Sequence, residues 1–202
     1  EHALAMRRLY EIKRTRFGHI VSEYVAPARK SNKVIILCAG APSYPGKRTN
    51  VMTFFAGKGY WVFVPRYRGT WESDGEFLKH SPHLDIVSTM NSVSKGFIDS
   101  WSEKKIRITN PQFYLLGSSF GGPAVILASL DKRVAKAVAI SPVIDWSKQK
   151  ETKEPLDFLD RFVPFAFGRA YRANRGVWKK LERNKFYAPM SAIGKIDGHK
   201  LM

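Results

Sequence analysis

One serine between two glycines has the residue types and the spacing that nucleophilic chemistry needs. Ser119 lies in a G-x-S-x-G arrangement with Gly117 and Gly121, between an apolar run typical of a buried strand and an Ala-rich run of helical character. Such a tight strand-to-helix turn requires small residues, because side chains at the two glycines would collide with neighbouring backbone. The turn would hold the Ser119 hydroxyl clear of the sheet and leave the Phe120 N–H at a helix start, where it can meet developing negative charge. This context predicts a nucleophilic serine, with an incidental serine in a glycine-rich turn as the alternative.

The elements that must position this turn alternate along the chain. Four apolar runs predict strands, at 33–38, 60–65, 112–116 and 134–140. Segments with helical periodicity lie between them, at 50–56, 81–101 and 122–130. Two alternating runs within 10–25 predict an antiparallel hairpin ahead of the first of these strands. We therefore expect an α/β protein: a mostly parallel sheet with helices on both faces and an N-terminal antiparallel hairpin.

Residues 147–188 break this alternation. A charged linker is followed by an aromatic-rich segment, which Pro164 interrupts, and then by a basic helical stretch from 169 to 185. The aromatic residues of this segment include Phe158, Phe162, Phe165 and Phe167. We expect a short helical cap inserted into a single domain that spans 1–202, and we predict that some of these phenylalanines line an acyl pocket. An ordinary pair of core-packing helices is the alternative.

Composition narrows the choice of partners. The 34 Lys and Arg residues outnumber the 17 Asp and Glu residues and leave a net charge of +17, but they are scattered rather than gathered in a stripe with aromatic residues. A solvated basic surface is therefore favoured over a specific nucleic-acid site. No apolar run is long enough to span a membrane, and the single cysteine, Cys38, favours a reducing, cytoplasmic setting and a buried thiol. No Cys/His cluster has metal-ligand spacing and no dinucleotide fingerprint follows the first parallel strand, so neither a metal nor another cofactor is expected.

These motifs together resemble the α/β-hydrolase fold, and within it the esterases and peptidases similar to prolyl oligopeptidase and dienelactone hydrolase. The resemblance runs over roughly residues 10–200, and the stretch 117–122 carries it most clearly. It implies that Ser119 is the nucleophile. The loop 39–42, Ala-Gly-Ala-Pro, lies where these enzymes place an oxyanion loop, which implies that the Ala41 N–H joins the Phe120 N–H in an oxyanion hole. Ala39 replaces the histidine usual in this loop.

A second loop also resembles these enzymes. The stretch 66–75 is similar to their D-x-R-G-x-G-x-S loop, with Arg66 where the acidic residue usually stands. The resemblance implies that Arg68 braces the site through hydrogen bonds.

The acid and the base of a triad are harder to place. In this fold they follow the serine in the order acid, histidine, and His199 is the histidine downstream of Ser119. Residues 200–202 resemble the opening of the first of two further strands, so we expect a truncated chain whose acid and base lie beyond Met202. The alternative is a whole protein in which Asp145 and His199 complete the triad.

The predicted activity is serine-dependent hydrolysis of a small-molecule carboxylic ester through an acyl-enzyme intermediate. A serine peptidase of the same fold is one alternative, because it would differ from an esterase only in the substrate that the cap admits. A catalytically silent binding protein that uses its basic surface is another. The missing strands would expose an apolar sheet edge, which predicts self-association through that edge.

Overall fold

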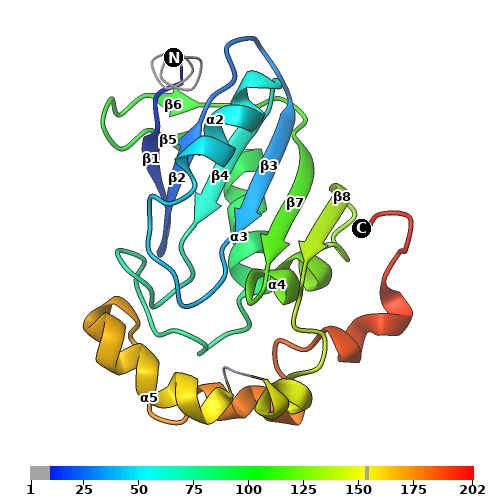
Figure 1. The fold of residues 1–202 in the computed structure, drawn as a ribbon. Helices are drawn as coiled ribbons and strands as arrows, with labels where there is room; N and C mark the ends of the chain where they lie inside the picture. The colour runs from blue at the N-terminus through cyan, green and yellow to red at the C-terminus, as the bar shows by residue number, and fades with distance from the viewer. Residues whose placement is uncertain (1–9, 153–154) are drawn as a thin grey trace.

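The computed structural model describes residues 10–152 and 155–202. Within these residues, a six-stranded sheet forms the centre of the molecule (Figure 1). Its strands follow the order β1 (Lys13–Phe17), β2 (Ile20–Val25), β4 (Trp61–Pro65), β3 (Lys33–Cys38), β7 (Gln112–Ser118) and β8 (Val134–Ile140). The last four run parallel to one another, whereas β2 is antiparallel to both β1 and β4. The predicted hairpin and parallel sheet are both confirmed.

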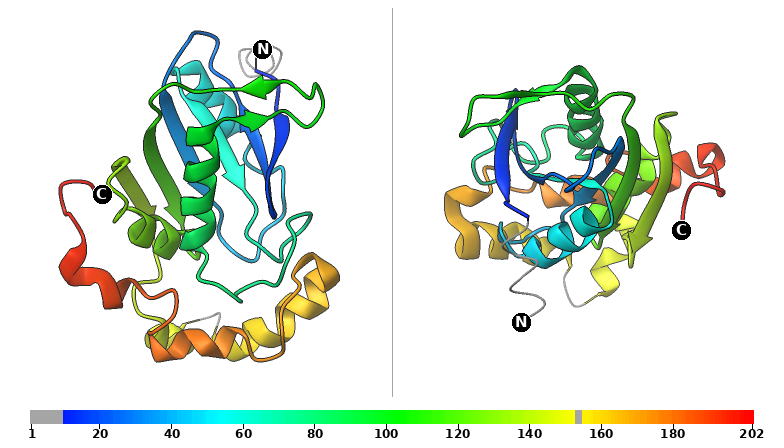
Figure 2. Two further views of the ribbon diagram at one scale, coloured as in Figure 1. Left: turned by 180° about the vertical axis from the view of Figure 1, so that it is seen from behind. Right: turned by 90° about the horizontal axis from the view of Figure 1, so that it is seen from above.

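Strand β3 shows why both faces of the sheet are covered. Its alternate residues point to opposite faces: Val34 and Ile36 belong to one buried cluster, and Ile35 and Leu37 to the other. The first cluster includes apolar residues of α3 (His83–Lys95) and α4 (Gly121–Ala128), and the second includes Met52 of α2 (Thr49–Gly57). Figure 2 shows the helices on the two sides of the sheet. The near-continuous apolar run of β3 is thus the signature of a strand buried on both faces.

Helix α3 ends earlier than its periodicity predicts. The apolar spacing continues through Phe97 to Trp101, but the helix stops at Lys95, and Gly96 adopts a φ of 91°. The chain then forms a two-stranded hairpin from β5 (Phe97–Ile98) and β6 (Lys105–Ile106). The prediction of a helix to residue 101 is wrong because Gly96 takes a backbone conformation in which no helix continues, and Phe97 packs against Phe17 and Tyr24 instead.

The cap lies beyond the carboxyl ends of the parallel strands (Figure 1). It contains one α-helix, α5 (Leu156–Phe167), and the 3₁₀ segments η1 (Trp146–Glu151), η2 (Gly168–Ala170) and η3 (Trp178–Arg183); η4 (Pro189–Lys195) follows it. Pro164 lies within α5 and does not interrupt it, and the predicted basic helix over 169–185 is replaced by short 3₁₀ pieces. None of the helices in 10–152 and 155–202 has the length and apolarity that a bilayer crossing needs.

The final residues add to the edge of the sheet. Leu201 pairs in parallel with Ala137 of β8. The backbone N–H of Ala137 donates to Lys200, and that of Met202 donates to Ala137, both at 2.8 Å. These contacts place residues 200–202 beside β8, where a strand opening at Lys200 is expected, as a single parallel bridge.

Candidate active site

The turn between β7 and α4 holds Ser119 in an unusual backbone conformation. Its φ is 51°, in the left-handed region that side chains other than glycine rarely occupy. Two backbone hydrogen bonds hold it there: its N–H donates to the carbonyl of Ile140 at 3.0 Å, and its carbonyl accepts from Gly122 at 2.9 Å. The Ser119 residue is exposed. The turn thus places Ser119 at the carboxyl end of the sheet, after the last residue of β7.

Both flanking glycines are required by close backbone contacts. A Cβ on Gly117 would lie 2.6 Å from the carbonyl oxygen of Gly121, and a Cβ on Gly121 would lie 2.2 Å from that of Cys38. Neither distance is sterically possible without moving the backbone. The second contact also shows that the end of β3 lies directly against the first residue of α4.

The loop after β3 lies beside the serine. A Cβ on Gly40 would be 3.5 Å from the Ser118 carbonyl and 3.9 Å from the Ser119 Cβ. Residue 41 follows directly, so the structure brings the Ala41 loop and Ser119 together. Phe120 precedes α4, where the first N–H groups of a helix have no partner within it and carry partial positive charge.

Two buried tyrosines brace these segments, and sequence reasoning missed both. The Tyr67 hydroxyl donates to the Ala39 carbonyl at 2.9 Å, and the Tyr187 hydroxyl donates to the Phe120 carbonyl. Burial raises the pKa of both phenols well above their usual value, so both stay protonated donors. Tyr67 could have been found, because it lies in the loop that resembles a family motif. Tyr187, far along the chain in the cap, carries no sequence signal.

The loop over 66–75 is held by ion pairs. The Arg66 side chain is 6% exposed and contacts Glu72 and, at 2.8 Å, Glu23. Burial opposes ionisation of Glu72, but the hydrogen bond and charge of Arg66 outweigh it and lower the pKa of that carboxyl. The Arg68 guanidinium lies 3.0 Å from the buried Asp85 carboxylate on α3, which is the bracing contact that the resemblance implies.

A cavity adjoins the loop after β3. Its charged wall is formed by Glu23 and Arg66, and its aromatic side by Tyr44, Trp71 and Tyr171; Gly40 also lines it. Ser119 is not among its lining residues. The cavity is therefore a neighbour of the serine on the far side of Gly40 rather than a pocket directly over it.

Asp145 has a structural role. It precedes η1 and accepts hydrogen bonds from the Ser147 N–H at 2.9 Å, from the Ser147 hydroxyl at 2.6 Å and from the Asn184 amide. The hydrogen bond from the Ser147 hydroxyl, followed by that from Asn184, lowers the pKa of this carboxyl. The Asp145 carboxylate therefore caps the N-terminus of η1 and joins η1 to Asn184, which follows η3.

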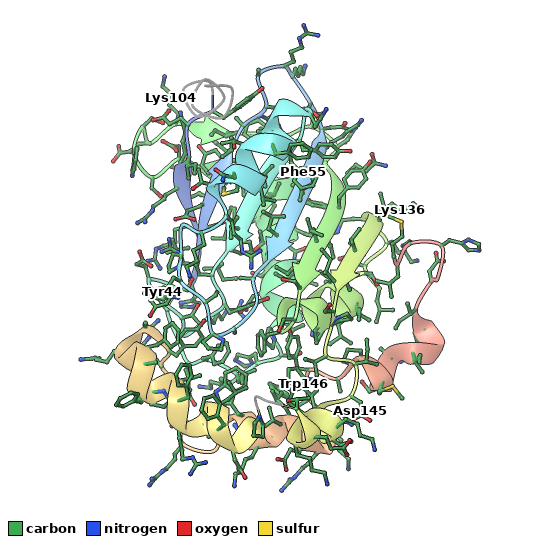
Figure 3. The ribbon with its side chains drawn as sticks, viewed as in Figure 1. Tyr44, Phe55, Lys104, Lys136, Asp145 and Trp146 are labelled. Carbon is green, nitrogen blue, oxygen red and sulfur yellow. The ribbon has the colours of Figure 1, made fainter. Side chains whose placement is uncertain are left out.

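His199 lies away from Ser119. Its carbonyl accepts from Lys136 Nζ at 2.6 Å, and its neighbour Leu201 pairs with Ala137, whereas Ser119 is bonded to Ile140 at the other end of β8. Lys136 and Ile140 are four residues apart on β8, which is about 13 Å of strand at about 3.3 Å per residue and far beyond the reach of a proton-transfer contact. In Figure 3, Lys136 and Asp145 lie at opposite ends of this side of the molecule. The structure therefore does not bring His199 to Ser119, as the alternative triad of Ser119, Asp145 and His199 would require.

The described histidines supply no base in hydrogen-bonding contact with Ser119. The ring of His83 lies 2.7 Å from the Ser81 hydroxyl at the start of α3, as expected for a residue at a helix start. Within 10–152 and 155–202 no cluster of His, Cys, Asp or Glu side chains could hold a metal ion. The serine turn, the loop after β3 and the bracing tyrosines are thus the assembled parts of the site.

Comparisons with known proteins agree with this fold. The sequence model of the family described as "Serine aminopeptidase, S33" matches residues 29–187. A polyketide transferase, GrgF, from a Penicillium species is 32% identical over 90 residues, which are 44% of this chain and 29% of that protein. Acylaminoacyl peptidase from Pyrococcus horikoshii superposes with a TM-score of 0.63 at 16% identity, over 97% of this chain and 32% of that one. An esterase from Pyrococcus furiosus superposes with a TM-score of 0.64 at 15% identity, over 93% of this chain and 67% of that one.

The fold and the match to the family model together identify this chain as an α/β-hydrolase-fold serine hydrolase. The chain belongs to the family described as serine aminopeptidase, S33, whose model covers well over half of its length. It spans about a third or less of the transferase and of the acylaminoacyl peptidase that it resembles.

Proposed function

We propose that this protein hydrolyses carboxylic esters through an acyl-enzyme formed on Ser119. The observation that carries the proposal is the conformation of that serine: a φ of 51°, between two glycines that admit no Cβ, at the carboxyl end of a parallel sheet. Backbone strain of this kind costs about 1–3 kcal/mol and is retained where function uses it. Ser141 has a similar φ of 45°, so it is the strain together with the two close glycine contacts that distinguishes Ser119.

The proposed reaction begins with attack of the Ser119 oxygen on the ester carbonyl carbon. The serine proton passes to a histidine base, which the described residues do not bring to Ser119, and the oxygen of the tetrahedral intermediate accepts hydrogen bonds from the Ala41 and Phe120 N–H groups. The base returns the proton to the leaving alcohol as the C–O bond breaks. Water, deprotonated by the same base, then releases the acid. The loop contacts of Gly40 and Gly121 support this pairing of N–H groups, because they bring the two segments together.

A peptidase is the second candidate, and the comparisons favour it. The family description and the Pyrococcus horikoshii protein both name peptidases. The acyl-enzyme step is the same for an amide, and only the leaving group changes from an alcohol to an amine. The transferase relative fits a third outcome of the same intermediate, in which an acceptor other than water takes the acyl group.

Labelling with a fluorophosphonate tests the nucleophile directly. The chain would be treated with the probe with and without imidazole, which can act as an external proton acceptor. We expect Ser119→Ala to abolish labelling and, in a form of the protein that carries the complete triad, to lower hydrolysis of a short p-nitrophenyl ester by on the order of 10³-fold or more. Ser118→Ala is the matched control, because it removes the adjacent hydroxyl of the same turn. If Ser118→Ala abolished labelling instead, the assignment would be wrong, and a form with the complete triad that stayed unreactive would support the catalytically silent binding protein.

Two further expectations remain proposals. The lone cysteine, Cys38, is buried, which supports the cytoplasmic setting predicted from its being the only one. Self-association beside β8 is supported by an apolar groove on the face of the sheet towards α2, lined by Phe55, Tyr114, Val138 and Met202. Light scattering at increasing protein concentration would detect a second copy bound there, and a strictly monomeric protein would contradict it.

A further inference from the structure

Helix α5 carries two apolar faces, and only one of them is buried. Leu156, Leu159 and Val163 pack into the core. On the opposite side, Phe158, Phe162 and Phe165 follow one another at intervals of four and three residues, so they share a face of the helix. They are 39%, 36% and 90% exposed. We call these three residues the phenylalanine stripe. A phenylalanine that is nine-tenths exposed gains little from burial on folding, so packing within the described residues does not account for this face.

The stripe continues towards the candidate site. The rings of Phe158 and Phe162 stack at 5.1 Å, and Phe162 meets Phe167 at 6.3 Å. Phe167 in turn packs against Tyr44 at 4.9 Å and against Trp71. Tyr44 lies on the loop after β3, four residues beyond Gly40, and is labelled beside the end of α5 in Figure 3. An apolar path therefore leads from the outside of the cap to the loop that flanks Ser119.

The charges around the stripe are positive. Arg161 lies one helical turn before Phe165 on the same side of α5, and Arg169 follows the helix. The segment 155–180 contains six basic and two acidic residues. Both acids already have partners: the Asp157 carboxylate lies 2.8 Å from Lys179, and Asp160 accepts from the Trp178 N–H. The uncompensated cations predict that whatever covers the stripe is apolar and anionic at once.

We propose that the phenylalanine stripe docks on an anionic lipid surface. A row of aromatic rings bordered by cations is typical of helices that lie in a membrane interface, where the rings enter the acyl boundary and the cations meet headgroup phosphates. α5 lies on the outside of the molecule in both figures of the fold, so its outer face can approach a flat surface (Figures 1 and 2). This inference deepens the proposed function and rests on it in one respect: docking there would present lipid-borne esters to the Ser119 end of the sheet.

Vesicle co-sedimentation of the 202-residue chain tests the docking without any need for activity. We expect binding to phosphatidylcholine vesicles that contain phosphatidylserine, weaker binding to phosphatidylcholine alone, and weakening of the former by added salt. The double variant Phe162→Ser, Phe165→Ser should lower the affinity by about tenfold or more, because each ring loses apolar burial in the interface. Arg161→Glu with Arg169→Glu should weaken binding to the anionic vesicles most.

Matched controls lie at the other end of the molecule. Trp101 is 67% exposed on the β5–β6 hairpin, beside Lys104 and Lys105. Trp101→Ser should leave vesicle binding unchanged, and Lys104→Glu with Lys105→Glu, which alters the net charge equally, should weaken it less than the α5 charge variant. Ser119→Ala should bind vesicles like the wild type, so failure of the proposed chemistry and failure of docking are separable.

Three outcomes would overturn the proposal. The first is absence of binding to any vesicle. The second is an equal loss on changing Trp101 and on changing the stripe, since that would indicate non-specific adhesion. The third is a stripe variant that turns an oligomer into a monomer while vesicle binding persists, because the stripe would then be covered by a second copy of the chain.

Discussion

The turn around Ser119 and the outer face of α5 lie at the same end of the sheet but are built in opposite ways. Around Ser119, backbone groups approach so closely that Gly121 cannot carry even a methyl group. On α5, Phe165 projects into solvent with 90% of its surface free. The first region is determined by contacts within the chain and the second is not. Internal packing therefore accounts for the geometry of the turn, whereas packing within the described residues does not account for the exposed rings of the stripe.

The largest expected effect tests how strictly the close backbone contacts restrict the residue at position 121. Gly121→Val should destabilise the protein by about 3 kcal/mol or more, because the new side chain meets the Cys38 carbonyl and the backbone must move. Gly194→Val is the control, since a Cβ there meets nothing within 4 Å. Urea unfolding of both variants measures the difference. Equal stabilities would show that the turn is not sterically determined, and the contrast with α5 would fail.

The β5–β6 hairpin is intermediate between the serine turn and the stripe, because the exposed Trp101 lies in a turn that is held by hydrogen bonds within the chain. Asp99 is buried, and it accepts hydrogen bonds from the Trp101 and Ser102 N–H groups and from Tyr24. Burial opposes its ionisation, but these hydrogen bonds outweigh it and hold the pKa at about 2. Because this pKa is below the unfolded value of about 3.9, the carboxylate adds stability above about pH 4 that is lost as the pH falls towards 2.

Asp99→Asn should remove this acid sensitivity and cost about 1–3 kcal/mol at neutral pH, since hydrogen bonds to a buried charge are lost. Urea unfolding of the wild type and the variant between pH 7 and pH 2 measures both effects. The stability gap should close at low pH. A constant gap across the range would mean that Asp99 does not fix the turn by its charge.

A smaller effect is expected at the bracing tyrosines. Tyr187→Phe removes the hydroxyl that donates to the buried Phe120 carbonyl and should cost about 1–2 kcal/mol. Tyr114→Phe is the matched control, because the Tyr114 hydroxyl meets Gln112 at an exposed site, 2.8 Å away, and its loss should cost less than about 0.5 kcal/mol. Thermal unfolding distinguishes the two. If both changes were equally mild, Tyr187 would not brace the turn.

The smallest expected effect lies on α5. Phe165→Ser should change the unfolding free energy by no more than about 0.5 kcal/mol, although it removes a whole ring. Leu159→Ala, on the buried face of the same helix, should cost about 2–5 kcal/mol. Chemical denaturation of the two variants makes the comparison within one element. A marked loss for Phe165→Ser would mean that the stripe is part of the core after all.

The acyl-pocket prediction for the cap phenylalanines fails for most of them. Phe158, Phe162 and Phe165 are exposed, and only Phe167 turns inward, against Tyr44, Trp71 and Tyr171. Sequence periodicity identifies two apolar faces on a helix but does not say which one meets the core. Packing against η3 and the sheet decided that here.

By itself, the sequence determined the order of the strands and helices and the geometry of the serine turn. Both depend on local rules: side chains alternate along a strand, and a turn this tight admits only glycine at positions 117 and 121. The tertiary structure alone decided the end of α3 at Gly96, the capping role of Asp145 and the distance of His199 from Ser119. These depend on contacts between residues far apart in the sequence: Phe97 with Phe17, Asp145 with Asn184, and Leu201 with Ala137. Long-range register of this kind leaves no mark in the spacing of residues along the chain.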